Sequence, residues 1–141
     1  MEKENAIKAN IITEEGEFKK KVLSIIKGCV FAIILSIILL TIFALLLTYT
    51  TLSESTITPV VLIITGISIL AGSTISSRKI KKNGLIYGGI VGFIYILILY
   101  LASSLCLTGF SLSANSFIML AVGVIAGIIG GIIGVNLNSR K

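Results

Sequence analysis

The sequence predicts an all-α integral membrane protein, a four-helix transmembrane bundle, and three observations lead to this fold class. The chain is 55% hydrophobic and 13% charged, with a mean hydropathy of +1.09. Its apolar residues form four long uncharged blocks, whereas a soluble amphipathic helix interleaves apolar and charged residues. Every Lys and Arg lies outside these blocks. Lipid is therefore the expected surroundings of most of the chain.

The membrane domain is predicted to cover residues 28–141. At about 1.5 Å per residue, each block is long enough to cross a hydrocarbon core about 30 Å thick. Thr58 and Pro59 are suited to open the second helix, because a hydroxyl can cap free amides and proline at the first helical position loses no hydrogen bond. The first block is longer than the apolar core of a cleaved signal peptide, so we expect a retained span. The four spans are expected at residues 28–49, 57–75, 85–107 and 117–135.

Residues 1–27 form a mixed-charge tail that we expect to lie outside the hydrocarbon. Its apolar residues recur at steps of three, four and seven positions, which is typical of an amphipathic helix. Two alternatives stay open: a helix lying on the membrane surface, or a solvated tail that extends the first span after Lys19. The apolar residues are Ile7, Ile11, Phe18, Val22 and Ile25.

The positions of the twelve Lys and Arg residues predict the orientation. Positive charge in short loops is retained on the cytoplasmic side during insertion. Residues 50–56 and 108–116 contain no Lys or Arg, so these loops are expected to face outward. The tail, residues 78–82 and the C-terminus hold all the basic residues, which places both termini in the cytoplasm.

Small residues recur four positions apart in every predicted span. Between membrane helices there is little hydrophobic drive, so small faces that allow close backbone approach promote packing. The candidate helix-packing residues are Gly28, Ala32 and Ser36 in the first span, Ser68, Gly72 and Ser76 in the second, Gly84, Gly88 and Gly92 in the third, and Gly123, Gly127, Gly131, Ala126, Gly130 and Gly134 in the fourth.

Most of these small residues fall in the cytoplasmic half of their spans, while the outer halves carry bulky side chains. We therefore expect a bundle that is tightly packed at the inner leaflet and splayed toward the outside. The fourth span has two adjoining small faces. It is expected either at the centre of the monomer or in contact with another subunit.

The chain has features of two tandem helical hairpins. Ser77-Arg78-Lys79 ends the second span as Ser139-Arg140-Lys141 ends the fourth, and Gly72 aligns with Gly134 at the same offset. Duplication would give a parallel repeat. The alternative is that any helix ending on the cytoplasmic side uses small residues followed by basic ones.

The sequence offers little chemistry for catalysis. It has no His, no Asp, no cluster of metal ligands, and no charged residue within a span. Cys29 and Cys106 are expected near opposite membrane faces, too far apart for a disulfide. We therefore expect no enzymatic activity, no cofactor, no small-molecule ligand and, since no recognition motif accompanies the basic residues, no nucleic acid.

A few hydroxyl groups lie within the spans. Most are expected to bond to backbone carbonyls of their own or a neighbouring helix. An exception would be a small polar cavity formed by Thr41, Ser103 and Ser104, opening outward where the bundle splays.

Two glycine-rich segments resemble the YrzE-like family of small, uncharacterised four-span bacterial membrane proteins. One is Gly84-x-x-x-Gly88-Gly89-x-x-Gly92, which opens the third span after a basic loop; the other is Gly130-Gly131-Ile132-Ile133-Gly134-Val135-Asn136, which closes the fourth. The resemblance covers most of residues 20–141. It implies four spans and a bacterial plasma membrane, and it supplies no activity.

Two functional hypotheses remain. The first is a non-enzymatic accessory or scaffolding protein, whose partners are the lipid bilayer and another membrane protein or a second copy of the chain. The second is a small transporter subunit or oligomeric pore built from the glycine faces. Missing intramembrane charges count against proton-coupled carriers and charge-selective channels, without excluding a pore lined by backbone.

Overall fold

The computed structural model describes residues 1–51, 53–80, 82–106 and 114–139, and within these ranges the chain forms four α-helices. All four are long and apolar enough to cross a membrane. The predicted all-α, four-helix membrane bundle is confirmed. The helices are α1 (Glu2–Tyr49), α2 (Glu54–Lys79), α3 (Gly84–Cys106) and α4 (Ala114–Ser139).

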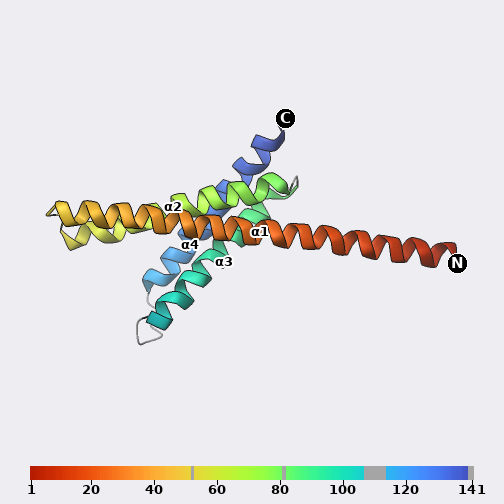
Figure 1. Ribbon diagram of the computed structural model, residues 1–141, viewed down its shortest axis with the longest axis horizontal. Helices are drawn as coiled ribbons and strands as arrows, with labels where there is room; N and C mark the ends of the chain where they lie inside the picture. The colour runs from red at the N-terminus through yellow and green to blue at the C-terminus, as the bar shows by residue number, and fades with distance from the viewer. Residues whose placement is uncertain (52, 81, 107–113, 140–141) are drawn as a thin grey trace.

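The helices pair into two antiparallel hairpins that cross each other at a steep angle (Figure 1). Helix α1 packs against α2, and α3 packs against α4. Helix α4 also packs extensively on α2, whereas α1 reaches α3 but not α4 within the described residues. Helices α2 and α4 therefore form the main contact between the hairpins.

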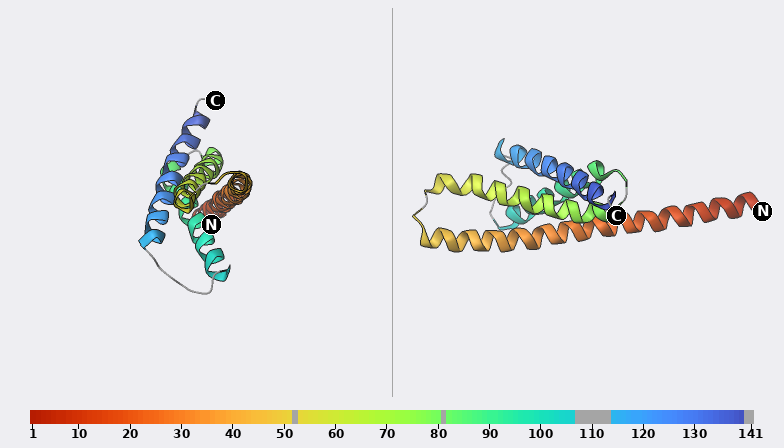
Figure 2. Two further views of the ribbon diagram at one scale, coloured as in Figure 1. Left: turned by 90° about the vertical axis from the view of Figure 1, so that its left-hand side faces the viewer. Right: turned by 90° about the horizontal axis from the view of Figure 1, so that it is seen from above.

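Helix α1 is a single continuous element of 48 residues. At 1.5 Å per residue it is about 72 Å long, more than twice the thickness of a hydrocarbon core. Residues 1–20 are exposed, and Figure 2 shows this segment projecting past the other helices. The tail is thus helical from Glu2 onward and continues the first span in one direction.

Helix α2 begins earlier than Thr58 and Pro59 suggested. Its first residue is Glu54, no side chain caps its N-terminus, and Pro59 lies inside the helix. A carboxylate in the first turn is favourable there. The carbonyl that Pro59 leaves without an amide partner belongs to Ser55, which is exposed, so the break in the hydrogen-bond ladder falls where it costs least.

We call one end of the bundle the basic end: there α1 makes its first contacts with the other helices, α2 and α4 end, and α3 begins. Buried residues concentrate in this half: none is found in α1 after Ser36, in α2 before Thr65, in α3 after Ile96 or in α4 before Gly123. In the opposite half, the end of α1 and the start of α2 diverge from the end of α3 and the start of α4 (Figure 1). The bundle is therefore tight at one end and splayed at the other, as the sequence predicts.

Candidate functional site

Helices α1 and α2 approach each other through small residues. A methyl group placed on Gly28 would lie 2.7 Å from the carbonyl oxygen of Gly72, and one on Gly72 would lie 2.6 Å from Cβ of Ala32. Ser76 packs against Gly28 from the next turn of α2. The Ser24 hydroxyl donates a hydrogen bond to the carbonyl oxygen of Ser76 at 3.1 Å. Close backbone approach and one interhelical hydrogen bond hold this hairpin.

Helices α3 and α4 meet along the longest run of glycines. A methyl group on Gly88 would overlap the carbonyl oxygen of Gly127, and one on Gly127 would overlap that of Gly88. In each case the obstructing atom belongs to the backbone and cannot rotate away. The same relation holds between Gly84 and Gly131 and for Gly92 against Gly123.

The second small face of α4 packs on α2. Methyl groups placed on Gly130 and Gly134 would overlap the carbonyl oxygens of Leu70 and Thr74. The Thr74 hydroxyl lies 2.7 Å from the carbonyl oxygen of Leu70 in its own helix and 3.0 Å from that of Gly130, so this close approach lets two carbonyl oxygens share its proton. Ala126 is half-buried beside the central apolar cluster. Helix α4 thus uses one face for α3 and the adjoining face for α2.

Ser36 and Ser68 are two other small residues of the predicted packing faces. Ser36 and Ser68 are buried, and their hydroxyls donate to carbonyl oxygens of their own helices, Ile33 at 2.8 Å and Ile64 at 2.9 Å. Between the hairpins, the thiol of Cys29 donates a weak, long bond to the carbonyl oxygen of Val91.

Thr41, Ser103 and Ser104 do not form the polar cavity considered from the sequence. Thr41 and Ser103 are exposed, and the Thr41 hydroxyl donates to the carbonyl oxygen of Ile37 in its own helix. These residues do not converge because α1 and α3 diverge at the splayed end (Figure 1).

Gly72 and Gly134, which the alignment of the two hairpins treats as equivalent, pack in different places. Gly72 packs on α1, the other helix of its own hairpin, whereas Gly134 packs on α2 of the neighbouring hairpin. In the second hairpin, the close contacts between the two helices are instead made by Gly84 with Gly131 and by Gly88 with Gly127.

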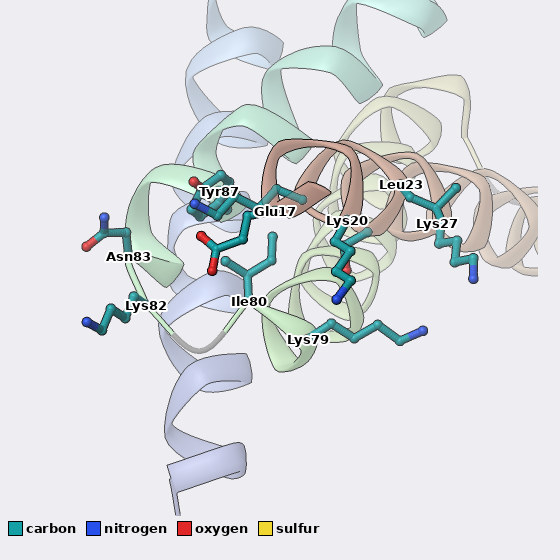
Figure 3. A pocket seen from close by; sticks show the side chains of 11 residues that line it. Glu17, Lys20, Leu23, Lys27, Lys79, Ile80, Lys82, Asn83 and Tyr87 are labelled. Carbon is teal, nitrogen blue, oxygen red and sulfur yellow. The ribbon is translucent and has the colours of Figure 1, made fainter. Parts of the chain in front are cut away.

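A cavity of about 600 Å³ opens at the basic end. It lies between α1, the end of α2, the α2–α3 connection and the first turn of α3 (Figure 3). In Figure 3, Glu17 lies beside Ile80 and Lys20 extends from α1 toward Lys79, while Lys79 and Lys82 extend to opposite sides of Ile80. Its charged and polar lining residues are Glu17, Lys20, Lys21, Ser24, Lys27, Lys79, Lys82, Asn83 and Tyr87.

A protein-family model described as "Protein of unknown function (DUF3792)" matches residues 21–134. This match covers most of the chain. The chain belongs to the DUF3792 family. No curated protein and no solved structure matches it.

The DUF3792 match takes in all the candidate packing residues and most of the cavity. It begins at Lys21 and ends at Gly134, the last small residue of α4 that packs on α2. Glu17 and Lys20, together with the exposed first part of α1, precede the matched region. The region that this DUF3792 protein shares with its family is therefore the helical bundle, without the first part of α1.

The described part of this DUF3792 protein brings few reactive groups together. Among the residues placed, no three His, Cys, Asp or Glu side chains converge in a way that could hold a metal ion. Cys29 is buried and Cys106 exposed, and both are free thiols. What the fold does assemble is a set of five lysines that line one cavity at the basic end of the bundle.

Proposed function

We propose that this protein is a non-catalytic accessory or scaffolding subunit of a bacterial plasma membrane, with its basic end in the cytoplasm. The distribution of Lys and Arg supports the orientation. The YrzE-like resemblance supports the bacterial location. The bundle would anchor the protein, and the projecting part of α1 would bind a partner.

The observation that carries this proposal is an uncovered apolar stripe on α1. Ile7, Ile11, Phe18 and Val22 are exposed by 58%, 51%, 68% and 37%. At about 100° per residue they fall within roughly 60° of one another on the helix surface.

This stripe continues the face that α1 uses inside the bundle. By the same helical angle, it aligns with the buried residues Ile25, Cys29 and Ala32, which pack in the two apolar clusters of the core. A partner helix on the stripe would therefore occupy, outside the membrane, the side of α1 that the bundle occupies within it. Covering these side chains would remove apolar surface from water, which favours association.

The second hypothesis, a pore built from glycine faces, has weaker support. All the glycine ladders of α3 and α4 face another helix of the same chain. The outward surface carries branched side chains such as Ile34, Ile38 and Ile125, which suit lipid contact.

The test is capture of partners by the full-length chain from membranes in mild detergent, identified by mass spectrometry. I11E places a charge on the stripe, while I12E places the same charge on an exposed residue about 100° away. We expect a specific partner that is lost with I11E and retained with I12E. Equal retention by both variants would contradict the role of the stripe, and ion or solute flux through liposomes containing this chain alone would favour the pore.

A further inference from the structure

The cavity at the basic end concentrates positive charge that the chain does not neutralise. Five lysines and one glutamate line it, which gives a formal charge of about +4 from the difference. In the part of the chain that the structure describes, the one ion pair within 4.0 Å joins Lys8 to Glu4, on the exposed part of α1. Because the cavity lysines repel one another, an anion placed between them would be stabilised.

The cavity lies at the level expected for lipid headgroups. Lys27 directly precedes the uncharged run of α1, and Lys82 and Asn83 directly precede α3. At this boundary the hydrocarbon core gives way to phosphate groups. Basic pockets between membrane helices at this depth are suited to anionic headgroups.

The lining is apolar as well as basic. Leu23 and the buried Ile80 contribute aliphatic surface. Tyr87 lines the cavity and packs against the buried cluster of Ile25, Cys29 and Val91. A free anion would make no use of this surface, whereas the glycerol and first acyl carbons of a phospholipid would cover it.

The start of α3 adds to the attraction for an anion. The carbonyl oxygen of Asn83 accepts the amides of Ile86 and Tyr87 at 3.0 and 3.2 Å, which begins the helix beside the cavity. The first amides of a helix have no partner within the helix and carry partial positive charge. Their partial positive charge adds to that of the cavity lysines.

We propose that this cavity binds the phosphate-bearing headgroup of an anionic phospholipid from the leaflet at the basic end. Lys20 and Lys79, which belong to different helices and line the same cavity, contact the phosphate, and Leu23 and Ile80 contact the glycerol region. The headgroup thereby joins α1 to the end of α2. This proposal is independent of the accessory role, because it concerns lipid alone.

The test uses the full chain in nanodiscs of phosphatidylcholine with a minor fraction of phosphatidylglycerol, and native mass spectrometry counts the lipids retained. We expect the native protein to retain phosphatidylglycerol over phosphatidylcholine. One lysine near an anionic headgroup contributes about fivefold in affinity, so K20Q/K79Q is expected to lose about 30-fold of this preference. K27Q/K82Q, a second pair from the same cavity, is expected to behave alike.

The matched control is K3Q/K8Q, which removes the same charge from the exposed part of α1. It is expected to keep the preference for phosphatidylglycerol. Equal losses in the control and the cavity variants, or no loss in either cavity variant, would overturn the proposal. Complete displacement of the lipid by excess inorganic phosphate would assign the cavity to a free anion instead. Far-UV circular dichroism verifies that each variant is folded.

Discussion

Gly88 and Gly127 lie opposite each other where α3 packs on α4, and each faces the other's backbone carbonyl. A side chain at either position would have to displace a helix, because no rotamer change can relieve a contact with backbone. Dense packing of this kind makes even one added carbon costly. Gly66 in α2 provides the contrast, since a methyl group there would meet nothing within 4 Å.

We therefore predict that Gly88→Ala lowers the free energy of unfolding by about 1–3 kcal/mol. Gly66→Ala, the matched control, should leave it unchanged or raise it by up to about 1 kcal/mol, because alanine favours the helix. Unfolding by titration with a denaturing detergent in mixed micelles, followed by circular dichroism, measures both. Equal effects of the two substitutions would contradict the close approach of α3 and α4.

Much of this packing is readable from residues alone. The spacing of Gly84, Gly88 and Gly92 defines a small face on one side of α3, and the two ladders of the fourth span indicate two neighbours. Sequence spacing does not say which helix each face contacts. That Gly134 packs on α2 while Gly131 packs on α3 depends on the crossing of the hairpins, which no local pattern encodes.

On the scale of elements, α1 combines two environments in one helix. Its first buried residue is Ser24, and residues 1–20 are exposed along the whole projecting part. Local signals there conflict, because Gly16 and the dense charge disfavour a helix while alanine, glutamate and lysine favour one. The sequence alone therefore did not decide whether residues 1–27 form a helix on the membrane surface or extend the first span.

Deletion of residues 2–16 is predicted to leave the stability of the bundle within about 0.5 kcal/mol of the native value. The reason is that the deleted segment packs on no other helix. Far-UV circular dichroism should lose the signal of the removed turns while the unfolding transition stays in place. Ile25→Ala, at a buried position of the same helix, is the positive control and should cost about 2 kcal/mol. A comparable loss in the deletion variant would argue against an unsupported projection.

At the scale of the whole molecule, the four spans and the segregation of charge follow directly from the sequence. The uncharged blocks and the placement of Lys and Arg are global patterns that need no tertiary information. The basic cavity was missed because its parts are distant in sequence. Lys20 and Lys79 are brought together only when Gly28 packs on Gly72, and each alone is typical of a loop or helix end beside the membrane.

The predicted orientation is tested with single cysteines in a background that carries C106A. Ser53 is exposed in the α1–α2 connection and Lys82 is exposed at the basic end. In intact cells, a membrane-impermeant maleimide should label S53C, and label K82C only after permeabilisation. The reverse pattern would place the basic end outside. The C106A background alone serves as the control, since its remaining thiol, Cys29, is buried.

Because α1 is one continuous helix, the number of residues in its projecting part sets both the height and the direction of its N-terminal end relative to the bundle. Removing one residue from the projecting segment brings the tip about 1.5 Å nearer the membrane and turns it by about 100°. A deletion of seven residues nearly restores the original bearing, whereas one of two residues would present the opposite flank. Binding of a partner protein to this part of α1 should therefore survive deletions of seven residues, about two turns, and be lost with deletions of intermediate length.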